Sequence, residues 1–135
     1  MIKTKLTFNL IILLLIIFLA SCEGYTYREW KVSNESSTTI MVKAGLLFES
    51  DTVYHEIETG QEKIITITTE DKGDSEVQLA YDVFSSFLIT NKDTLTTDMN
   101  FADNDSWDIW IEQTKSNPPH YEQIYTLIVT NADFQ

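Results

Sequence analysis

Apolar and polar side chains alternate along most of residues 25–129, and this alternation constrains the fold more than any other feature. In the segment TIMVKAGLLF, Ile40, Val42 and Ala44 share one parity, and the later segment KIITITT is rich in β-branched residues. Alternation of this kind is typical of half-buried strands, and β-branched side chains favour pleated structure. Polar turns separate the segments. The pattern therefore predicts an all-β fold, an antiparallel β-sandwich of seven or eight short strands.

The first expected strand, YTYREWKVSN, changes its pattern part-way. Tyr25 and Tyr27 share one parity, whereas Trp30 and Val32 share the other. A strand that switches parity either contains a bulge or is buried on both faces. We expect one of these arrangements near residues 28–29.

The segment VQLAYDVFSSFLIT is ambiguous between helix and strand. Its first half fits one face of a helix, and its second half alternates. We favour a strand over residues 85–90. A hairpin-like turn at NKD then leads into residues 94–96.

The first 21 residues have the features of a secretory signal peptide. Lys3 and Lys5 give a basic start, and residues 10–20 form an unbroken apolar run. A membrane-spanning helix needs about 20 apolar residues, so the run is short for one. A soluble exported protein with a stray cysteine and an uncleaved membrane anchor are the alternatives.

The only cysteine of the chain, Cys22, lies directly after this run and follows Leu19, Ala20 and Ser21. The pattern Leu-Ala-Ser-Cys resembles the lipobox of bacterial lipoproteins. In that family the signal peptidase recognises these positions and cuts before the cysteine, whose thiol carries a diacylglyceryl group. The resemblance implies a lipoprotein signal peptide over residues 1–21 and a lipidated Cys22. A short tether, residues 22–24, would then join the lipid to a β-sandwich domain over residues 25–135.

The mature part of the chain is similar to small lipoproteins of Bacteroidota. The similar segments are WKVSNESSTTIMV, SFLITNKDTL, DSWDIW and YTLIVTNADF, which together cover about a third of that part. The resemblance implies an immunoglobulin-like or related β-sandwich without an assigned activity. It implies no catalytic residue.

The charge of the chain narrows the classes of partner. The formal net charge is −12, and it becomes −14 when Lys3 and Lys5 leave with the signal peptide. Such acidity argues against nucleic acid, whose phosphates bind basic side chains. We expect the membrane as a partner through the lipid anchor, and an envelope protein or a glycan as a further partner. Glu23 stands where the enteric retention signal has Asp, which favours the outer membrane, on its periplasmic or its surface side.

The residue patterns of common catalytic and metal sites are absent from the sequence. There is no HExxH, no Cys-His metal spacing, no GxSxG elbow and no glycine loop for phosphate. His55 falls on the apolar parity of its strand and His120 lies in a turn, so both are expected to be structural. The loop at residues 98–108 gathers four aspartates but lacks the glycine and the closing glutamate of an EF-hand. We expect no enzyme activity, no cofactor and no metal, and calcium binding by this loop is left open.

The segment WDIWIE carries the candidate ligand-binding residues. Trp107 and the two isoleucines share the face that we expect in the core, and Asp108, Trp110 and Glu112 share the other face. Asp108 and Glu112 would lie roughly 13 Å apart on one strand, too far for a two-carboxylate hydrolase. An indole flanked by acids suits a sugar or protein contact, unless a loop covers it.

The sequence therefore predicts a non-catalytic cell-envelope lipoprotein with a structural or partner-binding role. The alternative is a carbohydrate-binding accessory lipoprotein that uses exposed aromatics such as Trp110.

Overall fold

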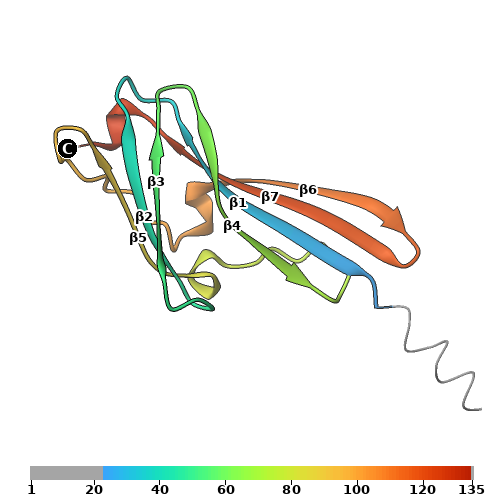
Figure 1. Ribbon diagram of the computed structural model, residues 1–135. Coiled ribbons are helices and arrows are strands. Elements are labelled where there is room, and N and C mark those ends of the chain that lie inside the picture. The colour runs from blue at the N-terminus through green and yellow to red at the C-terminus, as the bar shows by residue number, and fades with distance from the viewer. Residues whose placement is uncertain (1–22, 135) are drawn as a thin grey trace, which may run out of the picture.

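Seven strands form two sheets in the computed structural model, which describes residues 23–134 (Figure 1). The strands are β1 (Tyr25–Asn34), β2 (Ile40–Leu46), β3 (Thr52–Ile57), β4 (Glu62–Glu70), β5 (Phe84–Asn91), β6 (Trp107–Ser116) and β7 (Pro119–Val129). Three short 3-10 turns lie between or after them: η1 (Ala80–Asp82), η2 (Asn104–Ser106) and η3 (Asn131–Asp133). The prediction of an all-β sandwich is confirmed.

The strand order differs in one respect from a purely antiparallel sandwich. One sheet has the order β4-β1-β7-β6 and the other β3-β2-β5. All neighbours are antiparallel except β1 and β7, which run parallel over their whole length. A constant-type immunoglobulin domain instead places strands 1, 2, 5 and 4 in one sheet. The immunoglobulin-like part of the prediction is therefore not confirmed.

The core lies between the two sheets and is centred on Trp30. The predicted inward residues Ile40, Val42 and Ala44 are fully buried. The ring of Trp30 stacks on Tyr125 at 3.9 Å between centroids and meets Trp107 edge-on at 5.1 Å. Aromatic pairs of this kind add to the free energy gained by burial.

The expected parity switch in β1 is wrong. Burial alternates along the whole strand, and the inward positions before Trp30 are polar: Thr26 and Arg28. The register between β1 and β4 does shift, but two residues later than expected, between Trp30 and Lys31. The extra residue lies on β4, where Ile65 points into the core.

The ambiguous segment resolves mainly as strand. The expected strand over residues 85–90 is β5, and the helical pattern yields only η1. The turn after β5 is followed by an isolated bridge between Thr90 and Thr96 rather than a full hairpin strand.

The four-stranded sheet is longer than its partner. In Figure 1 it continues to the right beyond β2, β3 and β5, so the second sheet does not cover the inner face of this projecting part. The extended segment 71–79, which we call the strap, lies on that face. The strap therefore replaces the missing second sheet there.

Candidate functional site

The residues predicted for lipidation lie outside the described part of the chain. These are Leu19, Ala20, Ser21 and Cys22. The described chain begins one residue later, at Glu23, whose side chain is exposed but whose carbonyl oxygen accepts a hydrogen bond from Gly73 in the strap. Gly24 has a φ of +75°, and a Cβ atom at this position would collide with the carbonyl oxygen of Pro119. A glycine is therefore needed here, because glycine has no Cβ atom and adopts a positive φ without a steric cost.

Strand β6 presents the candidate ligand-binding residues as the alternation predicts. Trp107 is buried, whereas Trp110 is 47% exposed. Asp108 and Glu112 are exposed on the same face as Trp110. Ile109 faces inward with Trp107 and is half-buried. Ile111, which we also expected in the core, is only half-buried and is not among the residues that pack against the core cluster. The alternation of faces is as predicted, and the ligand-binding role stays a prediction.

The strand register places Trp110 at one end of a row that crosses the four-stranded sheet. Trp110 pairs with Ile124 on β7, which lies opposite Glu29 on β1, which lies opposite Ile67 on β4. The neighbouring rows add acidic and apolar side chains. We call these three rows the Trp110 face: Thr69, Tyr27, Glu122, Glu112; Ile67, Glu29, Ile124, Trp110; Ile64, Lys31, Thr126, Asp108.

The Trp110 face combines apolar and acidic side chains. Ile64 and Ile67 are almost half exposed, like Trp110. Sequence reasoning identified the β6 residues but missed those on β1, β4 and β7, because their alignment depends on the strand order. The signal that could have helped is the pair of outward isoleucines on β4, Ile64 and Ile67, in a segment that is otherwise polar on that face.

A second feature that sequence reasoning missed is a buried arginine beneath the strap. Arg28 is 4% exposed. Its Nη1 donates a hydrogen bond to Glu70 Oε2 at 3.0 Å, and its Nε donates one to Gln123 Oε1 at 3.0 Å. Gln123 also accepts a hydrogen bond from the Tyr125 hydroxyl at 2.6 Å. Arg28 therefore anchors a buried polar network where the apolar core ends.

This network fastens the strap to the sheet. Gln123 Nε2 donates to the carbonyl oxygen of Glu76 at 3.0 Å, and the backbone N–H of Gln78 donates to the Tyr125 hydroxyl at 2.8 Å. Thr26 Oγ1 donates to the carbonyl oxygen of Lys72 at 2.5 Å. Buried polar groups are stable only when hydrogen-bonded, so these contacts favour one position of the strap.

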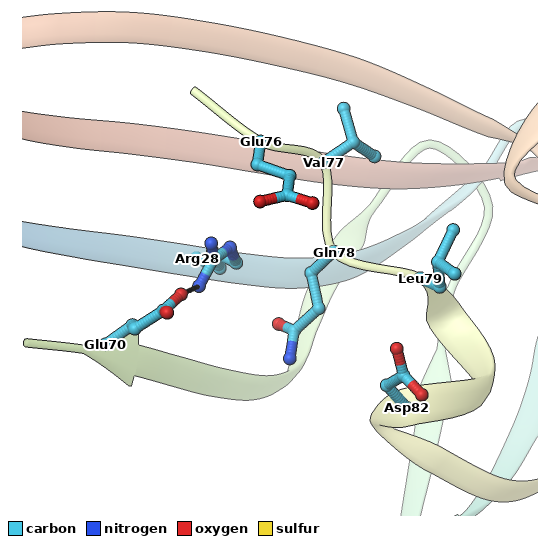
Figure 2. A pocket seen from close by; sticks show the side chains of 7 residues that line it. All are labelled: Arg28, Glu70, Glu76, Val77, Gln78, Leu79 and Asp82. Atoms are coloured by element: carbon cyan, nitrogen blue, oxygen red, sulfur yellow. Dashed lines mark hydrogen bonds and ion pairs between the residues drawn. The ribbon is translucent and has the colours of Figure 1, made fainter. Parts of the chain in front are cut away.

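Beside Arg28 the strap leaves an acidic cleft of about 200 Å³ (Figure 2). Its lining residues are Arg28, Glu70, Glu76, Val77, Gln78, Leu79 and Asp82. Figure 2 shows the Glu76 and Asp82 carboxylates on different sides of the opening. At the edge of this network, the pKa of Asp74 is lower than usual, mainly because Lys72 donates a hydrogen bond to its carboxylate. Most of the lining residues are polar, so the cleft is a polar gap between the strap and the four-stranded sheet.

The other residues considered in the sequence analysis are the two histidines and the acidic loop, and their contacts are within the fold. His55 and His120 are half-buried. The expectation that His120 lies in a turn is wrong, because it lies in β7, where it pairs with Tyr25 and its ring meets the Tyr25 ring at 6.1 Å. In the loop at 98–108, Asp103 accepts a hydrogen bond from the backbone of Asp105 and so caps η2. No three acidic, histidine or cysteine side chains gather as a metal site within residues 23–134.

The chain was compared with protein-family models, curated proteins and solved structures. None of the three comparisons gives a match. We therefore infer function from the exposure, contacts and charge of this chain's own residues. Along the described residues, every helix is too short or too polar to cross a membrane.

Proposed function

We propose that this protein is a non-catalytic, lipid-anchored protein of the cell envelope, at the outer membrane, and that its β-sandwich binds a partner through the Trp110 face. The observation that carries this proposal is the exposure of Trp110. A large aromatic side chain that is 47% exposed, in a row with Ile124 and Ile67, is an apolar surface available for contact. Exposed apolar patches rimmed by polar residues are characteristic of interaction sites.

A binding role fits the acidic residues better than catalysis does. Asp108 and Glu112 lie four residues apart on one strand, which corresponds to roughly 13 Å. Both point to solvent from an open sheet face. A hydrolase instead needs two carboxylates that converge on one bond.

If Cys22 is lipidated, the contacts of the next two residues determine how close the domain lies to its anchor. Gly73 N–H donates to the carbonyl oxygen of Glu23 at 2.9 Å, and Gly24 packs against Pro119. The residue that follows Cys22 is thus already part of the domain. The sandwich would stand directly on its lipid anchor.

The first prediction concerns this anchor. In bacterial cells given radiolabelled fatty acid, the full chain should become labelled, and Cys22→Ser should abolish the label because the thiol is the acceptor. The measurement is autoradiography of the immunoprecipitated protein. Ser21→Ala serves as a control, since alanine is also small. Equal labelling of the wild type and Cys22→Ser would show that the thiol is not the acceptor.

The second prediction tests partner binding through the Trp110 face. A photo-crosslinking amino acid at position 110 should give a discrete crosslinked product in intact cells. The matched control is position 54, because Tyr54 is an exposed aromatic on the outer face of the other sheet. The measurement is the shift of the protein on a denaturing gel. No product at position 110, or equal products at both positions, would refute this use of the face.

A carbohydrate-binding accessory role is the second candidate function. Trp110 favours it, because an exposed indole between Asp108 and Glu112 offers a flat apolar surface with acceptors on both sides. Retention of the full-length protein on a glycan array, lost in Trp110→Ala, would favour this candidate over a protein partner.

A further inference from the structure

The Trp110 face carries more negative charge than its own contacts balance. Glu112 and Glu122 are direct partners across β6 and β7. Like charges at directly opposite positions destabilise a sheet. The three rows contain one basic side chain, Lys31, and it already pairs with Glu62 at 3.0 Å. The face therefore has unbalanced carboxylates beside exposed apolar groups.

The central carboxylate of this face, that of Glu29, has one hydrogen-bond partner on its own strand. The hydroxyl of Tyr27 donates a hydrogen bond to Glu29 Oε2 at 3.3 Å. Glu29 also lies between Ile67 and Ile124 in the row that ends at Trp110. A carboxylate between apolar side chains matches a long basic side chain, whose methylene stem is apolar and whose end is charged.

We infer that the Trp110 face binds a basic, arginine-bearing protein segment, an inference that rests on the proposed function and names its partner class. A guanidinium group pairs with carboxylates through two parallel hydrogen bonds and stacks on an indole. The face supplies both kinds of group within adjacent rows: Trp110 next to Asp108 and Glu112, and Glu29 two strands away.

Charge favours a basic protein segment over other occupants of the same face. An anionic lipid surface is repelled by Glu29, Glu112 and Glu122. A second copy of the face would bring like charges together, and like-charge contacts oppose association. A neutral sugar would leave the opposed pair Glu112 and Glu122 without a counter-charge. A basic segment balances these carboxylates and covers the indole.

The size of the face sets the length of the segment. Four strands spaced about 4.8 Å apart span roughly 14 Å from Trp110 to Ile67. An extended chain advances about 3.3–3.6 Å per residue, so about four residues cross the face. A segment of this length that alternates arginine with an apolar residue would reach both Glu29 and Trp110.

The test uses the full-length protein in zwitterionic detergent micelles and a fluorescent pentapeptide that alternates arginine with leucine. Fluorescence anisotropy should show binding of this peptide and none of its glutamate counterpart. Binding should weaken about tenfold in the double variant Glu112→Gln/Glu122→Gln, because each substitution removes one exposed ion pair with the peptide. It should also weaken as salt rises from about 50 mM to about 500 mM.

Control variants place the binding site. Glu56→Gln on the outer face of the other sheet and Asp82→Asn in the acidic cleft should bind the peptide as the wild type does. The double variant should melt at the wild-type temperature or higher, because it removes an opposed like-charge pair. No binding of the arginine peptide, or loss of binding only in Asp82→Asn, would overturn the inference.

The same double variant separates this inference from the proposed function. If the crosslinked product at position 110 persists unchanged in Glu112→Gln/Glu122→Gln, the face binds a partner but not through its charge. The inference then fails while the proposed function stands. If position 110 gives no product, the proposed function itself fails.

Discussion

Trp107→Ala should lower the free energy of unfolding by about 3–5 kcal/mol, as truncation of a buried aromatic side chain does. Trp107 is 5% exposed, and its ring lies 5.1 Å from that of Trp30 and 5.9 Å from that of Phe84. Its Nε1 donates a hydrogen bond to the carbonyl oxygen of Phe101 at 2.8 Å. The substitution therefore removes core packing and the hydrogen bond that joins β6 to the loop before it. Equilibrium denaturant unfolding measures the loss.

Trp110→Ala is the matched control, because the same substitution is made three positions along the same strand. The side chain of Trp110 is about half exposed, so less buried area is lost, and we expect a change of about 1 kcal/mol or less. Both variants should keep a far-ultraviolet circular dichroism spectrum typical of strands. Equal destabilisation would mean that Trp110 is a core residue, and it would remove the main support for a binding face.

Arg28→Ala should detach the strap and lower the free energy of unfolding by about 3 kcal/mol. Hydrogen bonds from charged groups contribute about 1.5–3 kcal/mol each, and Arg28 makes one to Gln123 and one to Glu70. The Glu70 contact contributes less, because that carboxylate is about half exposed and screened by solvent. The larger part of the loss comes from the buried partner Gln123.

The position of the strap can be measured separately from global stability. Hydrogen exchange of the backbone N–H of Gln78, which donates to the Tyr125 hydroxyl, should accelerate in Arg28→Ala under native conditions. The N–H groups of β2, in the other sheet, should exchange at rates set by global unfolding alone. Glu70→Gln is the control, with an expected loss within about 1 kcal/mol. Unchanged exchange at Gln78 would show that Arg28 does not hold the strap.

Most of the strands could be predicted from the sequence, because the alternation of Ile40, Val42 and Ala44 reports directly which face is buried. The same reasoning failed at Thr26 and Arg28, which are polar but point inward. Hydropathy cannot identify such positions, since their burial depends on hydrogen-bond partners far along the chain. Arg28 and Gln123, for example, are 95 residues apart in sequence.

The candidate site could be predicted only in the part that lies on one strand. Trp110, Asp108 and Glu112 share a face because side chains alternate along any strand. Glu29 and Ile67 join them only through the order β4-β1-β7-β6, and the parallel pairing of β1 with β7 has no local signal. Strand order is a property of long-range packing, and alternation within a strand carries no information about it.

The parallel pairing of β1 with β7 also determines when the protein can fold. The first strand of the domain pairs with its last, so Tyr25 meets His120 only after almost the whole domain has been synthesised. Contacts this distant in sequence close large loops, which slows folding. Before β7 emerges, β6 has no neighbour in its sheet and β1 has only β4. The growing chain thus remains open until synthesis is nearly complete, and a chain that ends before Pro119 would leave the sheet in two parts.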